Sequence, residues 1–387
     1  MNDVTYLDNN ATTALDERVF ASMLPALRHA GNASSTHAAG QWAREAVETA
    51  RGQVADLLAA NRQEIIFTSG ATEANNLAIN GIVGAGGRTE IVSCTTEHAA
   101  VLEPLEQLRR SGRRVTLVPV DVDGMIDLAA LAAAVTERTL LISVMAANNE
   151  TGVLTPLSDV AGLAQAKGAL VHTDATQLIA WGGVDTSVVP VDLLSLSAHK
   201  FHGPTGVGAL YVRRAVQQQM LPIVHGGGHE RGLRSGTLNT AGIVGLGAAA
   251  EISRMEGFSA GEATRDRRDR LYALLRNEFG PLELQLNGHA TLRAPGTLNI
   301  SLLGLEADAV LAAAPSVAMS TGSACSTGVP GPSHVLTAMG FGRDRAEGAI
   351  RISLSRDTSE ADILVAGKAL IAGIRQVQTQ TALVGAR

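Results

Sequence analysis

The sequence predicts an α/β protein built around a largely parallel sheet that is covered by helices on both faces. Short runs rich in β-branched and aliphatic residues recur along the chain, and stretches with helical spacing separate them. Hydrophobic residues make up 45% of the chain but aromatic residues only 3%, so small aliphatic side chains must fill the core. At 387 residues the chain exceeds the usual size of one domain, which favours two.

The expected elements alternate regularly through the first half of the chain. The six expected strands span residues 64–69, 90–95, 115–120, 140–145, 169–173 and 193–197. The helical stretches around them span residues 41–58, 72–83, 99–110 and 157–166. After residue 252 the pattern changes to a long, polar, Arg-rich helical stretch through residue 279, with shorter strands expected at 297–302 and 349–354. This change predicts a second, smaller domain.

Charge and composition limit the classes of partner. The formal net charge is -6, so the chain has no overall cationic field of the kind that attracts nucleic acid or anionic lipid. Residues 1–20 are polar and include several acidic side chains, unlike a secretory signal, and no apolar run reaches membrane-spanning length. We therefore expect a cytoplasmic protein with no direct nucleic-acid contact and no membrane contact.

The two cysteines, Cys94 and Cys325, lie in unlike settings and form no Cys-x-x-Cys pair for zinc or disulfide exchange. Cys94 lies in an apolar run and is expected to be buried and inert. Cys325 lies in the run 320–332, which lacks hydrophobic periodicity and is rich in Gly, Ser, Thr and Pro, so we expect a mobile loop. With about five residues on each side at ~3.3 Å per residue, the thiol could travel roughly 15 Å. An incidental loop thiol is the alternative, although an exposed free cysteine is a liability.

The strongest chemical signal is a lysine at the end of an expected strand. The run 194–206 passes from a buried strand into a polar, glycine-rich turn that carries Lys200. Free lysine has a pKa of about 10.4, so a lysine that forms a Schiff base at neutral pH needs desolvation or a neighbouring positive charge to lower that value. A pocket at the strand end can supply both; an ordinary exposed loop lysine is the alternative.

Two further strand ends carry matching chemistry. Asp174 follows the strand expected at 169–173 and suits the carboxylate that a protonated pyridine nitrogen needs when the ring serves as an electron sink; a helix cap is the alternative. The run 67–74 leaves a strand, turns at Gly70 and opens a helix, which directs backbone N–H groups and hydroxyls at one anion, such as a monophosphate. Such turns are common, so this signal is weak by itself.

Six ordered motifs between residue 6 and about residue 365 resemble those of NifS/IscS-type cysteine desulfurases. They are the runs 6–13, 31–37, 147–152, 197–200, 234–237 and 322–325. The resemblance implies a class V aminotransferase of fold type I that depends on pyridoxal 5'-phosphate, with a mainly parallel seven-stranded sheet. It also implies a large cofactor-binding domain at residues 15–254, and a smaller α+β domain formed by 1–14 and 255–387 that carries the mobile Cys325 loop. A homodimer with L-cysteine as substrate is part of the same expectation.

The resemblance assigns roles to individual residues. Lys200 would bind the cofactor aldehyde and Asp174 would pair with the ring nitrogen. His98 would stack on the ring and serve in proton transfer, while Asn149 and Gln177 would hydrogen-bond the phenolic oxygen. The cofactor phosphate would be surrounded by Ala71, Thr72, Ser197 and His199, and Thr237 would reach the phosphate of the neighbouring subunit.

The substrate needs a partner for its carboxylate and an acceptor for its sulfur. Arg351 lies in the middle of the strand expected at 349–354, where an unpaired arginine would be costly. It is therefore the expected carboxylate partner, assisted by Asn149, and a structural ion pair with an acidic neighbour is the alternative. Cys325 would attack the substrate sulfur as a thiolate, keep it as a persulfide and pass it to a protein acceptor, while L-cysteine becomes L-alanine. Free cysteine has a pKa of about 8.5, so this thiolate needs local stabilisation.

The chain departs from the family pattern at Thr176, at His229 and at residues 379–387. The last run shows no sign of the extended tail that housekeeping members use to dock an iron-sulfur scaffold. General iron-sulfur cluster supply, a nitrogenase-type assembly pathway and a dedicated thiolation pathway, such as DNA phosphorothioation served by DndA-type desulfurases, therefore all stay open. Two other classes also remain: another fold-type-I transaminase or lyase, which would not need the loop around Cys325, and a non-catalytic partner-binding homologue.

Overall fold

The computed structural model describes residues 4–83, 88–321 and 331–385, and its main element is a seven-stranded sheet. The strand order is β2-β8-β7-β6-β5-β3-β4, and every neighbouring pair is parallel except the two that include β8. The strands are β2 (Ile65–Thr68), β3 (Glu90–Cys94), β4 (Val115–Val118), β5 (Thr139–Ser143), β6 (Leu170–Asp174), β7 (Leu193–Ser197) and β8 (Gly208–Val212). The expected α/β class and the mainly parallel seven-stranded sheet are confirmed.

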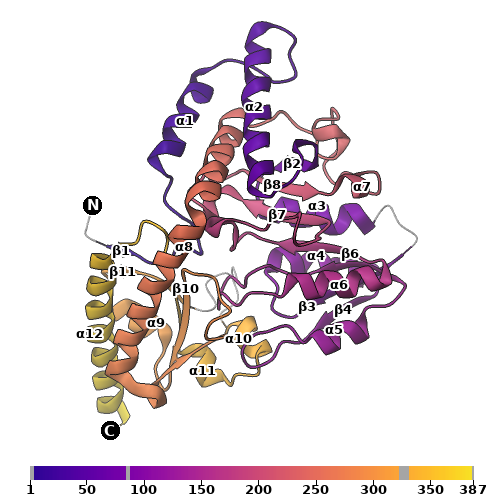
Figure 1. The fold of residues 1–387 in the computed structure, drawn as a ribbon. Coiled ribbons are helices and arrows are strands. Elements are labelled where there is room, and N and C mark those ends of the chain that lie inside the picture. The colour runs from indigo at the N-terminus through magenta and orange to yellow at the C-terminus, as the bar shows by residue number, and fades with distance from the viewer. Residues whose placement is uncertain (1–3, 84–87, 322–330, 386–387) are drawn as a thin grey trace.

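Helices cover both faces of this sheet (Figure 1). One face packs against α1 (Glu17–Arg28), α2 (Ala38–Leu57), α5 (Leu128–Ala134), α6 (Leu157–Lys167) and the first half of α8 (Thr240–Glu283). The other face packs against α3 (Ala71–Val83), α4 (Ala99–Arg110) and α7 (Arg214–Gln217). Because most strand residues are buried on both faces, the strands read as continuous aliphatic runs rather than as alternating ones.

A smaller antiparallel sheet of order β12-β13-β10-β9 has a hydrophobic cluster of its own. Its strands are β9 (Leu284–Leu286), β10 (Thr297–Leu302), β12 (Ser320–Thr321) and β13 (Ala349–Ser353), and β1 (Thr5–Tyr6) pairs separately with β11 (Val317–Ala318). The remaining helices are α9 (Ala307–Ala313), α10 (His334–Ala338), α11 (Arg343–Glu347) and α12 (Glu360–Gly385). Helix α8 runs from the larger sheet to the smaller one and contributes to both clusters (Figure 1). A domain boundary near residue 254, inside this helix, stays a proposal.

Strand β8 and helix α8 differ from the sequence prediction, and helices α1, α5 and α7 were not among the predicted helical stretches. Strand β8 was not predicted, because it is short, begins at Gly208 and follows a glycine- and proline-rich turn. Helix α8 begins at Thr240 rather than near residue 252. Its first turns carry small and aliphatic residues that are buried against the larger sheet, so they lack the polar pattern by which the rest of the helix was recognised.

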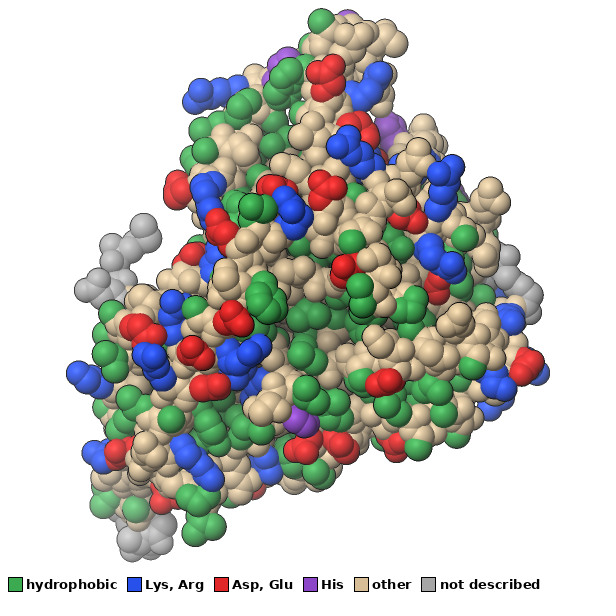
Figure 2. Space-filling model, in the orientation of Figure 1, with side chains coloured by type: hydrophobic (Ala, Val, Ile, Leu, Met, Phe, Trp, Pro, Cys, Tyr) green, Lys and Arg blue, Asp and Glu red, His purple; other side chains and the backbone are tan. Residues whose placement is uncertain are grey.

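The surface in view mixes both signs of charge, with acidic and basic side chains interspersed (Figure 2). Within the described ranges, no helix is both long enough and apolar enough to cross a membrane.

A buried ion pair ties the loop before α8 to the larger sheet. Arg51 of α2 donates to both carboxylate oxygens of Glu230 at 2.8 and 2.7 Å, and both side chains are almost wholly buried. Glu230 also accepts the backbone N–H of Phe67 on β2 at 2.8 Å, and the Arg51 guanidinium lies over the Phe67 ring at 4.6 Å. This cluster fixes the start of the loop that carries Thr237.

We predict that Glu230→Gln lowers the free energy of unfolding by about 3 kcal/mol, because loss of one charge leaves the Arg51 guanidinium buried without its counter-ion. Glu48→Gln is the matched control, since Glu48 contacts the same guanidinium but is half exposed, and it should cost less than about 1 kcal/mol. Denaturant unfolding followed by circular dichroism measures both. Equal losses in the two variants would contradict a role for the buried pair.

Candidate active site

A cavity of about 490 Å³ lies at the carboxyl ends of the strands of the larger sheet. It collects nine of the residues that the sequence singled out: Ala71, Thr72, His98, Asn149, Asp174, Gln177, Ser197, His199 and Lys200. They come from the ends of β2, β3, β5, β6 and β7, because parallel strands deliver their following turns to the same edge.

Lys200 lies in a single 3-10 turn, Ala198–Lys200, that directly follows β7. Its Nζ donates to the backbone oxygens of Asn10 and Ala11 at 2.5 and 2.8 Å, so the N-terminal segment holds the amine at the cavity wall. The whole sequence has three lysines, and the other two, Lys167 and Lys368, are exposed on helices. Lys200 is therefore the one lysine of the chain that lines this cavity.

Asp174 ends β6 with its carboxylate fixed by two hydrogen bonds. One oxygen accepts from the Asn75 side chain at 2.7 Å and the other from the backbone N–H of Thr176 at 3.0 Å. Glu97, nearby, is fully buried, and its pKa is raised well above the usual range by burial, with the Asp174 charge acting in the same direction. Burial therefore favours the neutral form of Glu97, which limits the negative charge beside Asp174.

The turn between β2 and α3 has the geometry of an anion site. Ser69, Gly70 and Thr72 line the cavity at the start of α3, where backbone N–H groups have no partner within the helix. Gly70 adopts φ of +155°, a value that L side chains rarely take. A Cβ on Gly208 would lie 2.7 Å from the Gly70 Cα, so a glycine on β8 lets the strand pass directly behind this turn.

Two histidines on the cavity wall have fixed rings. His98 is the N-cap of α4, and its Nδ1 accepts the backbone N–H of Ala100 at 3.0 Å, so the hydrogen of the neutral ring is on Nε2. His199 places Nδ1 3.1 Å from Thr12 Oγ1. Burial lowers the pKa of His199 to about 4, and the neighbouring Lys200 acts in the same direction. His199 is thus a neutral hydrogen-bonding group at pH 7.

Two predicted site residues within the described ranges, Arg351 and Thr237, are not part of the cavity lining. The Arg351 side chain on β13 is almost wholly buried and forms a 2.8 Å ion pair with Asp8, the alternative that its position in the strand had left open. It also donates to the backbone oxygen of Asn149 at 3.2 Å, so it lies directly behind the cavity wall. Thr237 is exposed in the loop before α8. Cys325 and the mobile loop expected around it lie outside the described residues.

Asn10 also lines the cavity, although the sequence analysis assigned it no role. Its backbone oxygen accepts from Lys200 Nζ and from Gln177 Nε2, the latter at 3.0 Å. Its side-chain amide donates to the Asn149 backbone oxygen at 3.1 Å. The signal that could have identified it is the polar run from Asp8 to Thr13, whose two asparagines are buried in the structure.

The lining fits the pyridoxal 5'-phosphate that the family resemblance implies. An amine, the fixed carboxylate of Asp174, a helix N-terminus and the neutral ring of His199 meet in a single cavity. Two lining groups, Asn75 Oδ1 and Thr176 Oγ1, are buried and have no hydrogen-bond partner among the described residues. Buried polar atoms without partners are costly, so their presence here indicates a site built to receive a polar ligand.

Comparisons with known proteins agree with this chemistry. The family model for aminotransferase class-V matches residues 5–365. A cysteine desulfurase IscS of Anaeromyxobacter sp. (strain Fw109-5) is 44% identical over 383 residues, which are 98% of this chain and 94% of that protein. Among solved structures, a NifS-like protein superposes with a TM-score of 0.89 at 37% identity, covering 96% of this chain and 99% of its own. DndA from Streptomyces lividans superposes with a TM-score of 0.76 at 37% identity, covering 89% of this chain and 97% of its own.

A buried histidine beside the site makes stability depend on pH. His172 on β6 has Nδ1 2.8 Å from Ser143 Oγ and Nε2 3.0 Å from Ser195 Oγ. Burial lowers its pKa to about 4, and the Asp174 charge opposes this only in part. An unfolded histidine has a pKa of about 6.5, so His172 contributes stability above that pH that is lost as the pH falls toward 4.

We predict that His172→Gln reduces the loss of unfolding free energy between pH 7.5 and pH 4.5 by about 2 kcal/mol relative to the unmodified chain. His225→Gln, which removes an exposed histidine, serves as the control and should leave the pH dependence unchanged. The measurement is denaturant unfolding at both pH values. An identical pH dependence in the His172 variant and the unmodified chain would show that the buried ring does not carry the effect.

Proposed function

Because the chain belongs to the aminotransferase class-V family, we propose that it is a pyridoxal-phosphate-dependent cysteine desulfurase, which converts L-cysteine to L-alanine and collects the sulfur as a persulfide on Cys325. The observation that carries the proposal is the meeting of Lys200, Asp174 and His98 in one cavity, in a chain 44% identical to a named cysteine desulfurase. Bound pyridoxal 5'-phosphate supplies the electron sink that makes the α-proton of the substrate acidic.

The lining residues divide the binding of this cofactor among them. Lys200 would hold the aldehyde through Nζ, and the carboxylate of Asp174 would pair with the ring nitrogen and keep it protonated. The ring of His98, whose orientation is fixed by the Nδ1 bond to Ala100, would stack on the cofactor ring. Side-chain amides of Asn149 and Gln177 serve the phenolic oxygen.

The phosphate site combines a helix N-terminus with neutral donors. Ala71 and Thr72 present backbone N–H groups at the start of α3, and Ser197 adds a hydroxyl. Neutral His199 donates through a ring nitrogen without bringing a charge that pH would change near neutrality. Thr237, exposed in its own subunit, would reach the phosphate bound by the neighbouring subunit, and the active form would then be a homodimer.

Substrate recognition rests on Arg351 and Asn149. The guanidinium binds the substrate carboxylate, since its planar fork matches two carboxylate oxygens. Asp8 lies 2.8 Å from this guanidinium and supplies a counter-charge to the buried arginine. Asn149 lies between Arg351 and the cavity and assists at the same carboxylate.

The reaction needs one proton acceptor and one sulfur acceptor. Lys200 Nζ or His98 removes the α-proton of the substrate. The Cys325 thiolate attacks the substrate sulfur, so that the S–S bond forms as the C–S bond breaks, and the carbon left behind takes up a proton to become the methyl group of alanine. The persulfide then passes to a protein acceptor, either for iron-sulfur cluster assembly or in a dedicated thiolation pathway. A nucleophilic free thiol suits a reducing compartment, which supports a cytoplasmic location.

We expect the purified chain to bind pyridoxal 5'-phosphate and, with a thiol reductant, to release sulfide and alanine from L-cysteine in equal amounts. Cys325→Ser should retain the absorbance of the bound cofactor but lower sulfide release at least about 100-fold, because the attacking thiolate is gone. Cys94→Ser is the matched control, since Cys94 is buried away from the cavity lining, and it should keep the activity.

Several outcomes would contradict this proposal. A transaminase or lyase of the same fold would release products without dependence on Cys325, and a partner-binding homologue would not turn over cysteine at all. Sulfide release that Cys325→Ser leaves unchanged would remove the assignment of the nucleophile.

We predict that the chain sediments at twice its 40.0 kDa mass and that each site uses Thr237 from the neighbouring subunit. Lys200→Ala and Thr237→Asp should each be inactive alone, the second because its carboxylate repels the cofactor phosphate. Equal mixtures, refolded or co-expressed, should regain about a quarter of the normal activity, since half of the dimers then contain one intact site of two. A mixture that stays inactive would contradict sharing of the site between subunits.

A further inference from the structure

The N-terminal segment 10–16 lies along the turn that carries Lys200. At one end, the backbone oxygens of Asn10 and Ala11 accept from Lys200 Nζ. At the other end, the backbone N–H of Asp16 donates to the backbone oxygen of His202 at 3.1 Å. The contacts between these ends concentrate on Thr13.

The Thr13 hydroxyl bridges the two sides of the lysine turn. Thr13 Oγ1 donates to the backbone oxygen of His199 at 3.0 Å and accepts the backbone N–H of His202 at 2.7 Å. The Thr13 backbone N–H donates to the same His199 oxygen at 2.9 Å. His199 precedes Lys200 in the chain and His202 follows it. The Thr13 hydroxyl therefore links the backbone on the two sides of the lysine.

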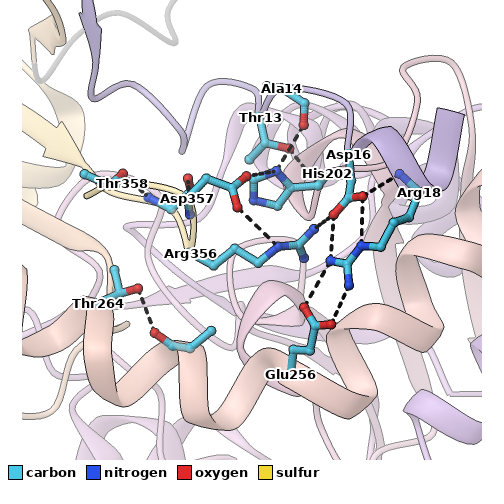
Figure 3. A network of polar contacts seen from close by, with 12 residues as sticks. Thr13, Ala14, Asp16, Arg18, His202, Glu256, Thr264, Arg356, Asp357 and Thr358 are labelled. Atoms are coloured by element: carbon cyan, nitrogen blue, oxygen red, sulfur yellow. Dashed lines mark hydrogen bonds and ion pairs between the residues drawn. The ribbon is translucent and has the colours of Figure 1, made fainter. Parts of the chain in front are cut away.

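This bridge holds a strained backbone. His202 adopts φ of +66°, a left-handed conformation that costs energy for a residue other than glycine and persists only where its surroundings determine it. Its ring is held as well, with Nδ1 3.0 Å from the Ala14 backbone oxygen and 3.3 Å from an Asp357 oxygen (Figure 3). The segment that holds His202 thus also fixes the direction in which the preceding lysine leaves the turn.

The segment itself is anchored beyond the turn. The Asp16 carboxylate binds Arg18 at 2.8 Å and also binds Arg356, which follows β13 (Figure 3). Arg18 in turn binds Glu256 of α8 at 2.5 Å. Because Asp16 forms ion pairs with both Arg18 and Arg356, the backbone near Thr13 is restrained, and Thr13 is held against the lysine turn.

We propose that Thr13 is a positioning residue for Lys200. The Thr13 hydroxyl sets the direction of the lysine amine, because it joins the His199 carbonyl to the His202 amide. The inference rests on the proposed function, because it assumes that the amine must meet the cofactor aldehyde and the substrate α-carbon. It concerns geometry rather than substrate binding, since the carboxylate partner Arg351 makes none of these contacts.

The test compares Thr13→Val with Thr13→Ser in the cofactor-loaded protein. Valine keeps the shape but removes the hydroxyl, which leaves the His202 N–H without its acceptor, whereas serine keeps the hydroxyl. We expect Thr13→Val to release pyridoxal 5'-phosphate about tenfold faster on dilution and to lower kcat about tenfold, with KM within about twofold. Thr13→Ser should stay within about twofold of the unmodified chain in all three quantities.

Two further variants serve as controls. Thr13→Ala removes the same hydroxyl without the bulk of valine and must reproduce the faster release. Thr49→Val removes an exposed hydroxyl that only bonds within α2, and it should change none of the three quantities. Unchanged release and kcat in Thr13→Val, or equal defects in Thr13→Ser, would overturn the inference while leaving the proposed function standing. A chain that binds no pyridoxal 5'-phosphate would instead overturn the proposed function.

Discussion

Two backbone oxygens of the N-terminal segment, those of Asn10 and Ala11, hold the amine of Lys200 where β7 ends. The same segment reaches the smaller sheet, because the Asn9 side chain donates to the Ser353 backbone oxygen and the Asn10 backbone N–H donates to the Ser353 hydroxyl. The site is therefore assembled from three parts of the chain that are far apart in sequence. Each part must be in place before the amine can face the carboxylate of Asp174.

Burial shifts the pKa values of several titratable groups around the cavity. Burial raises the pKa of Glu97, and it lowers the pKa values of His172 and His199 to about 4, so both rings are neutral at pH 7. The carboxylates that line the cavity are those of Asp174 and of Glu73, and Glu73 is paired with Arg234. Such an environment suits an anionic cofactor and a carboxylate substrate, because the field at the reacting atoms depends on few groups, each fixed by hydrogen bonds.

Much of the fold could be read from the sequence because burial leaves a strong pattern. Strands covered on both faces must be continuous aliphatic runs, so β2 to β7 were predicted within one or two residues at either end. Strand β8 was not predicted, because it begins with Gly208 and glycine is typical of turns. The strand needs this glycine to pass close behind Gly70. The first turns of α8 were not predicted as helix, because their small, buried residues form no polar face.

Some features of the site could likewise be predicted from the sequence, and others could not. Nine of the residues that the sequence singled out line one cavity, because parallel strands bring their carboxyl ends to one edge. The roles of Asn10 and Thr13 could not be predicted, because their partners lie far away in the chain. The Asn10 backbone oxygen accepts from the Lys200 side chain, 190 residues away, and the Thr13 hydroxyl contacts backbone groups 186 and 189 residues away. The ion pair between Arg351 and Asp8 had been one of two alternatives, and only the fold shows that this aspartate lies beside that arginine.

The scarcity of lysine in this chain allows the site of cofactor attachment to be tested directly. Borohydride reduction of the protein loaded with pyridoxal 5'-phosphate, followed by peptide mass spectrometry, assigns the cofactor to one of three lysines. A single phosphopyridoxyl group on Lys200 is the predicted result. Attachment at Lys167 or Lys368, or no attachment at all, would contradict it.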